Sequence, residues 1–197
     1  GFIAAAGDRH LAEFMPGDQY LASPDSVREW MFALTTVDSR KKELEKRLER
    51  SRALAEGRQE VELKPSGEEG VLLIKSLCGL TRCISNVNIP NTEGQIPNLP
   101  RSAVVETNAV FSRDRIHPVM AGDVPEGVLP LVRVHAENQE RILHAALQCD
   151  FELALEALMH DPNAEAKIDR EQGRKLLAKM IRNTMAYLPE EWKDRVK

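Results

Sequence analysis

The ionisable residues best placed to do chemistry lie close together near the start of the chain. Asp8, Arg9, His10 and Glu13 form the densest group of such side chains beside apolar residues. An aspartate can act as a general base, and a histidine can act as a base or as a metal ligand at neutral pH. The same residues also suit an ordinary structural unit, in which Asp8 and Arg9 pair and His10 is hydrogen-bonded. The residues alone leave both interpretations open.

A second segment, residues 86–100, is unusually rich in asparagine and proline. Its asparagines are Asn86, Asn88, Asn91 and Asn98, and its prolines are Pro90, Pro97 and Pro100. Neutral amides on a rigid loop suit hydrogen bonding to the hydroxyl groups of a sugar or a ribose. Asparagine is also a common turn residue because its side chain bonds its own backbone. Gly94 would permit either a close backbone approach or a positive φ.

Other reactive residues give no recognisable site. The remaining histidines, His117, His135, His144 and His160, are scattered, and we expect them to be structural or solvated. Cys78 and Cys83 do not have the spacing of a zinc site. We expect all three cysteines, including Cys149, to be reduced and to pack as small hydrophobes. The chain contains no glycine-rich dinucleotide turn, P-loop or nucleophile elbow.

The composition excludes several classes of protein. The net charge is −4 and the isoelectric point about 5.8, which argues against a nucleic-acid-binding face. No apolar run approaches the roughly 18 residues of a membrane span. With 197 residues and 42% hydrophobic residues, the chain can form one globular domain. We therefore expect a cytoplasmic protein with no nucleic-acid or membrane partner.

The elements that must position these residues are mostly helices. We predict a helix after Pro24, a solvated helix over 38–56, and a buried helix over 71–78 that begins with a capping box at Ser66 and Glu69. Two strands are expected, near 84–89 and over 103–111. Three further helices are expected near 128–148, 151–159 and 169–187. The predicted fold class is α+β, dominated by helices and with a small sheet.

The two unusual segments occur in an order that resembles glycoside hydrolase family 4. Residues 7–16 are similar to a Ser-Glu-His-Phe-x-Glu-Tyr-x-Pro stretch of its α-galactosidases, and residues 86–100 to its Asn-Val-Pro-Asn-x-Gly-x-Ile-x-Asn-Leu-Pro signature. Residues 104–106 follow as in the Val-Val-Glu strand of that family, and residues 64–70 look closest to its α-galacturonidase branch. Two residues rather than one separate Asn91 from Gly94, and Thr107-Asn108 replaces Val-Pro. These departures leave the substrate open.

The resemblance implies a two-part enzyme that uses NAD and a divalent metal, usually Mn2+. Residues 1–197 would be its C-terminal α+β domain, similar to that of lactate dehydrogenases, and the NAD-binding Rossmann domain would lie outside this chain. The family oxidises C3 of the sugar, removes the C2 proton, eliminates the leaving group, adds water and returns the hydride. The family's metal ligands lie upstream of the matched region. A homo-oligomer is also implied.

The resemblance assigns expected roles to five residues. Asp8 or His10 would transfer the proton, and Asn91 and Asn98 would lie near the sugar or the nicotinamide. Arg9 would meet the carboxylate if the carbohydrate substrate is a uronide. We expect the 197 residues alone to fold without hydrolysing glycosides. Two other interpretations stay open: a non-enzymatic binding or oligomerisation module, and another NAD-dependent oxidoreductase that shares this domain.

Overall fold

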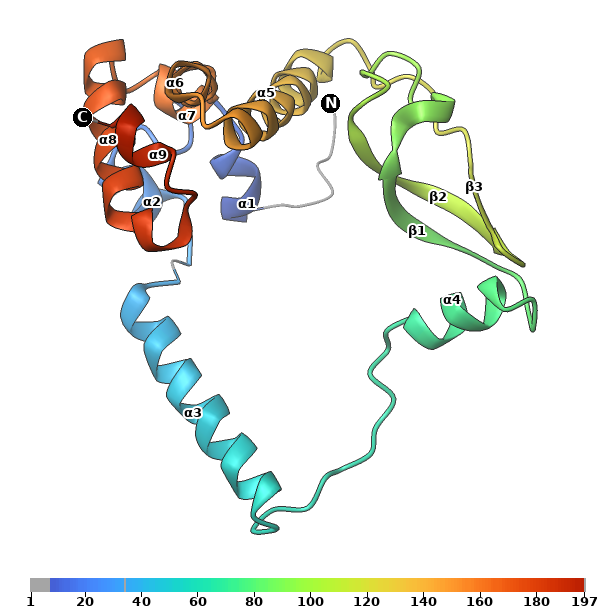
Figure 1. The fold of residues 1–197 in the computed structure, drawn as a ribbon. Coiled ribbons are helices and arrows are strands. Elements are labelled where there is room, and N and C mark those ends of the chain that lie inside the picture. Colours follow the sequence, from blue (N-terminus) through green and yellow to red (C-terminus); the bar gives the residue numbers. More distant parts are fainter. Residues whose placement is uncertain (1–7, 34, 197) are drawn as a thin grey trace.

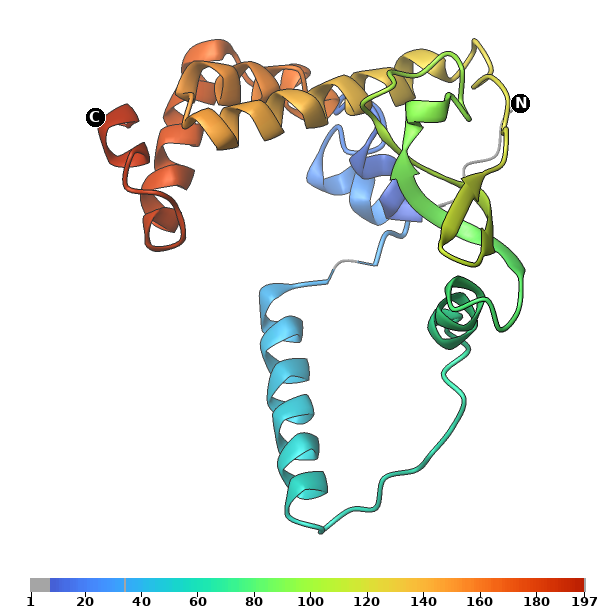
Figure 2. The same ribbon diagram turned by 45° about the vertical axis from the view of Figure 1, so that its right-hand side comes forward.

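The computed structural model describes residues 8–33 and 35–196. It combines helices with one three-stranded antiparallel sheet, which confirms the predicted α+β class. Figures 1 and 2 show a helical group at one side and the sheet at the other, with the long helix α5 (Leu129–Gln148) running from one to the other. The molecule therefore has two small cores that share one helix.

The helical group is built after α5 from helices whose starts are capped by aspartates. Asp150 caps α6 (Phe151–Met159), Asp161 caps α7 (Pro162–Glu165) and Asp169 caps α8 (Arg170–Thr184). Each carboxylate accepts backbone N–H groups that the first helical turn leaves unpaired. The short η2 (Met185–Tyr187) and α9 (Trp192–Arg195) complete the group. Its core holds Phe151, the fully buried Leu155, Ile181 and Trp192.

The sheet follows the order β1-β2-β3. The strands are β1 (Cys83–Pro90), β2 (Val104–Ser112) and β3 (Arg115–Pro118). Alternate residues of β2 are buried, namely Val105, Thr107, Ala109 and Phe111, as expected for a strand with one covered face. Val105 also packs with Leu99 and Ala103 in the second core, to which α5 contributes Leu129 and Ala136.

The chain before the sheet is less compact. Helix α1 (Asp8–Glu13) and helix α2 (Pro24–Glu29) lie beside the helical group (Figure 1), and Ser23 caps α2 in a capping box with Ser26. Helix α3 (Val37–Ala55), capped by Thr36, has no buried residue. Figures 1 and 2 show α3 pointing away from the rest, and residues 56–69 returning to the sheet. We call residues 37–69 the arm.

Helix α4 (Gly70–Leu77) contradicts two predictions. The expected capping box is wrong: the helix begins at Gly70, Ser66 accepts only the N–H of Glu68, and the Glu69 carboxylate accepts the hydroxyl of Ser85 instead. The expected burial is also wrong, because only Ser76 is buried while Val71 and Ile74 are 68% and 63% exposed. The sheet covers one side of this short helix and leaves the other side open.

The remaining predictions were partly confirmed. Both strands and the helices near 38–56, 128–148 and 151–159 are present, whereas α1, β3, α7 and α9 were not predicted. The three cysteines are free, but only Cys149 is buried, and Cys78 is exposed. Within the described part of the chain, no helix is long and apolar enough to cross a membrane.

Candidate functional site

The loop that joins β1 to β2, residues 91–103, is organised around the side chain of Asn91. This side chain is fully buried. Its Nδ2 donates to the carbonyl oxygens of Ile96, Leu99 and Pro100 at 2.9, 3.2 and 3.2 Å, and its Oδ1 accepts the N–H of Ile96 at 3.0 Å. One amide thus bonds to four backbone groups of the loop, of which the carbonyls of Ile96 and Pro100 also accept the N–H groups of Leu99 and Ala103. We call residues 91–103 the asparagine loop.

Asn98 ties the asparagine loop to the segment before α5. Its Nδ2 donates to the carbonyl of Val124 at 2.8 Å, and its Oδ1 accepts the N–H of Val124 at 2.9 Å. The carbonyl of Asn98 accepts a bond from Nη2 of Arg133, on α5, at 2.8 Å. Both predicted substrate-binding asparagines therefore bond to the backbone through both ends of their amides. Their expected contact with a sugar stays a prediction.

Gly94 and Arg101 form the outer edge of the asparagine loop. Gly94 has φ +73°, and a Cβ there would lie 2.0 Å from Nη1 of Arg101. The guanidinium therefore lies directly over the glycine, and its Nη1 donates to the carbonyl of Thr92 at 3.2 Å. Gln95, fully buried behind this edge, donates to the carbonyl of Pro90. Gly94 thus provides both a left-handed turn and room for Arg101.

Helix α1 carries the other group of predicted site residues. Nδ1 of His10 lies 3.7 Å from Oε2 of Glu13, and the two side chains are 57% and 55% exposed. Nη1 of Arg9 donates to the carbonyl of Ala33 at 2.5 Å and to Oγ1 of Thr35 at 2.9 Å. The side chain of Asp8 lies outside what the structure describes. The roles predicted for these three residues stay predictions.

The residues that follow α1 are fixed against the helical group. Nε2 of His135, on α5, lies 2.9 Å from the carbonyl oxygen of Phe14, and the two rings meet edge to face at 5.1 Å. Asn163 donates to the carbonyl of Glu13 at 3.0 Å. At Gly17 the backbone passes so close that a Cβ would lie 2.6 Å from the carbonyl oxygen of Asn163. These contacts hold α1 in a fixed position.

Helix α5 is the element that the two predicted segments share. Arg133 bonds to the asparagine loop, and two residues later His135 bonds to the segment that carries α1. Two residues advance an α-helix by about 3 Å. The two segments, about 80 residues apart in sequence, are therefore fixed to the same end of one helix, on opposite sides of it, because two residues also turn the helix by about 200°. Periodicity could not reveal this role, because Arg133 and His135 read as ordinary helix residues.

The described residues do not form a complete metal site. No three His, Cys, Asp or Glu side chains among them lie together as a metal ion would require. His10 is exposed and stays a candidate metal donor. No glycine-rich turn for a dinucleotide is present in the sequence either. Proton transfer and substrate binding stay predictions for the residues of this chain.

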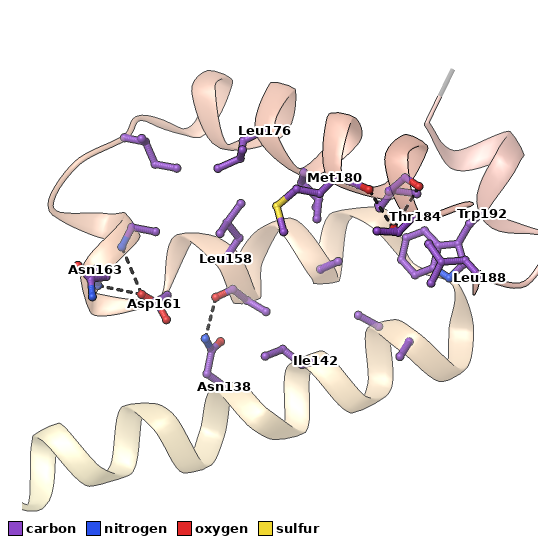
Figure 3. Close-up of a pocket in the computed structure, with 18 of the residues that line it drawn as sticks. Asn138, Ile142, Leu158, Asp161, Asn163, Leu176, Met180, Thr184, Leu188 and Trp192 are labelled. Atoms are coloured by element: carbon purple, nitrogen blue, oxygen red, sulfur yellow. Dashed lines mark hydrogen bonds between the residues drawn. The ribbon is translucent and has the colours of Figure 1, made fainter. Parts of the chain in front are cut away.

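A groove of about 670 Å³ lies elsewhere, between α5, α6 and α8. Figure 3 shows Ile142, Leu158, Leu176 and Met180 lining it. Asn138 is buried there and donates to the carbonyl of Ala157 at 2.7 Å, while its Oδ1 has no partner within the part of the chain that the structure describes. The apolar lining suits packing against another surface rather than catalysis.

Comparison with known proteins decides the family. A family model described as the family 4 glycosyl hydrolase C-terminal domain matches residues 1–164. The chain belongs to glycosyl hydrolase family 4. An α-galacturonidase of Lachnoclostridium phytofermentans is 56% identical over 192 residues, which are 98% of this chain and 41% of that protein. The family 4 chain therefore spans about two fifths of the length of this relative.

Solved structures share the fold of this family 4 chain. The crystal structure of the Bacillus subtilis protein lplD, described as a glucosidase, is 45% identical with a TM-score of 0.78, over 90% of this chain and 39% of that one. A 6-phospho-α-glucosidase from gut microorganisms, solved with NAD and glucose-6-phosphate, is 26% identical with a TM-score of 0.68, over 88% and 40%. A second structure of that kind, 23% identical, was solved with NAD and Mn2+.

Proposed function

We propose that this chain is the substrate-side domain of an NAD- and divalent-metal-dependent glycosidase that cleaves α-galacturonides. The observation that carries the proposal is the 56% identity to an α-galacturonidase over nearly the whole chain. The identity includes the segments that hold α1 and the asparagine loop, which the structure fixes to one end of α5. The proposal places the NAD-binding Rossmann domain in the part of the enzyme that this chain does not span.

The proposed reaction oxidises the sugar at C3, eliminates the aglycone and adds water. When bound, NAD would take up and return the hydride, and the metal, Mn2+ by resemblance, would polarise the sugar oxygens. Within this chain, Asp8 or His10 would remove the C2 proton. The exposed ring of His10 is accessible for that task. By resemblance we also expect the enzyme to be a cytoplasmic homo-oligomer.

The rest of α1 and its contacts would orient the proton-transfer group. Asn163 and His135 hold the backbone at Glu13 and Phe14, so the last turn of α1 cannot shift without breaking these bonds. Pre-positioning of a base within hydrogen-bond reach is what makes general base catalysis effective. Asn91 and Asn98, which the resemblance places near the sugar, would act on it through the shape of the asparagine loop.

The test uses the full-length enzyme that contains this chain. We expect it to release nitrophenol from 4-nitrophenyl α-D-galacturonide in the presence of NAD, Mn2+ and a reductant, and to prefer this substrate to the α-galactoside. The 197 residues alone should release none. Preference for the galactoside, or turnover without NAD, would contradict the proposal.

Substitution of the two candidate residues tests the assignment within α1. If Asp8 transfers the proton, Asp8→Asn should lower kcat about 100-fold or more. If His10 transfers it, His10→Gln should have this effect. Asp18→Asn is the matched control, because Asp18 is an exposed carboxylate in the following turn. Wild-type turnover in both variants would remove the proton-transfer role from α1.

A further inference from the structure

Two arginines are anchored on the asparagine loop. Nη2 of Arg133 donates to the carbonyl of Asn98 at 2.8 Å, and Nη1 of Arg101 donates to the carbonyl of Thr92 at 3.2 Å. Arg101 is also held over Gly94, where only a hydrogen leaves room for its guanidinium. Both side chains are exposed. Each guanidinium is thus positioned by neutral backbone groups of one rigid loop.

Neither arginine has an acidic partner. No ion pair involves Arg101 or Arg133 in residues 8–33 and 35–196, whereas other arginines of the chain pair with carboxylates: Arg28, Arg52, Arg58, Arg113, Arg141, Arg170 and Arg174. A guanidinium has five N–H donors. The bonds to Asn98 and Thr92 leave most of those donors available, and the remaining fork matches the two oxygens of a carboxylate.

We propose that Arg101 and Arg133 recognise the carboxylate of the uronic acid ring, and so select galacturonides over galactosides. The inference rests on the proposed function, and it goes beyond it by naming the groups that set the specificity. Arg9, the candidate suggested by resemblance, already uses its Nη1 for two acceptors, the carbonyl of Ala33 and the hydroxyl of Thr35. The loop arginines have the larger number of free donors.

The position of Arg133 connects this recognition to the proposed chemistry. His135 follows on the same helix and fixes the segment that carries α1. A sugar bound with its carboxylate at the asparagine loop would therefore lie at the end of α5 to which the segment of α1 is also fixed, with Arg133 and His135 on opposite sides of the helix. The amides of Asn91 and Asn98 contribute by keeping the carbonyls that orient the two arginines in place.

The test measures KM and kcat of the full-length enzyme for 4-nitrophenyl α-D-galacturonide, together with inhibition by free galacturonate and by free galactose. Arg133→Gln and Arg101→Gln should each raise KM for the galacturonide, and the inhibition constant of galacturonate, about 10- to 100-fold. The inhibition constant of galactose should stay within twofold and report an intact fold. Arg133→Lys keeps the positive charge but loses the planar pair of N–H donors. Its KM and its inhibition constant for galacturonate should lie between those of the wild type and Arg133→Gln.

The control is Arg113→Gln, an exposed arginine next to the β2–β3 turn that pairs with Asp114. It should leave both inhibition constants unchanged. The inference is overturned if both loop variants keep wild-type KM, if galactose and galacturonate binding weaken equally, or if Arg9→Gln alone abolishes the preference. Wild-type enzyme that cleaves the galactoside and not the galacturonide would refute the proposed function. Retained preference in the loop variants would refute this inference alone.

Discussion

The asparagine loop has little regular structure and the arm contains a 19-residue helix, yet the loop is much the better anchored of the two. Asn91 makes four side-chain bonds to the backbone within the loop, and Asn98 makes two to the backbone of Val124, outside it. In α3 no residue is buried, and its ion pairs join neighbours on the same helix or, between Glu49 and Arg58, the helix and the residues just after it. Regular secondary structure is therefore a poor guide to anchoring. A helix pairs its own backbone N–H and C=O groups, whereas those of a loop need other partners, here the side-chain amides of asparagines.

The largest effect should come from removing the centre of the asparagine loop. We expect Asn91→Ala to lower the free energy of unfolding by about 3 kcal/mol or more, since it removes four hydrogen bonds, deprives the carbonyl of Leu99 and the N–H of Ile96 of the partner that Asn91 provides, and opens a cavity. Urea unfolding at 25 °C measures this. Asn108→Ala, at an exposed position of β2, should cost less than about 0.5 kcal/mol. Equal costs would show that the loop is not held by Asn91.

A smaller effect is expected in the arm. Leu44 and Leu48 are 48% and 47% exposed, so changing both to alanine should alter the free energy of unfolding of this chain by less than about 0.5 kcal/mol. The matched substitution Leu155→Ala, at a fully buried leucine of the helical core, should cost about 2–5 kcal/mol. If the double change costs as much as Leu155→Ala, the arm packs against another surface in solution.

The smallest effect concerns pH. Lys46 donates a hydrogen bond to Glu43 in α3 and lowers the pKa of Glu43 below its usual value. Because the pKa of Glu43 is lowered in the folded state, its ion pair contributes stability at pH values above the unfolded pKa. This contribution is lost as the pH falls through the folded pKa. Acidification below about pH 4 should therefore lower the protection of the α3 amides against hydrogen exchange, after correction for the pH dependence of the intrinsic exchange rate. The interior of the asparagine loop is held by neutral amides and should change less, and Glu43→Gln should remove the difference in α3.

Much of the fold followed from the sequence where local signals suffice. Richness in β-branched residues located β2, and apolar residues at helical spacing located α5 and α6. The exposure of α4 could not be predicted from the sequence. An apolar run shows that a helix is suited to burial, but it does not show whether another element covers it. Ser66 and Glu69 had the spacing of a capping box, but Ser85, distant in sequence, competes for the Glu69 carboxylate.

The candidate site was predictable in its residues and not in their connections. The sequence singled out Asn91, Asn98 and the α1 residues by type and order. It could not show that both amides turn inward to the backbone, since sugar-binding and backbone-binding asparagines look alike in sequence. The partners of Arg133 and of His135, which was expected to be structural or solvated, were not predicted for a related reason. Their partners are single carbonyl oxygens of segments far along the chain, and every residue has a carbonyl oxygen.

The single helix that joins the two cores also restricts how this protein can change in length. Each residue of α5 turns the helix by about 100° and advances it by 1.5 Å. A deletion between His135 and Asn138 would rotate everything beyond it, so that Asn138 could no longer face Ala157 while Arg133 still faced Asn98. A substitution on α5 changes only the contacts of one side chain. The loss or gain of one residue would instead rotate the helical group relative to the asparagine loop.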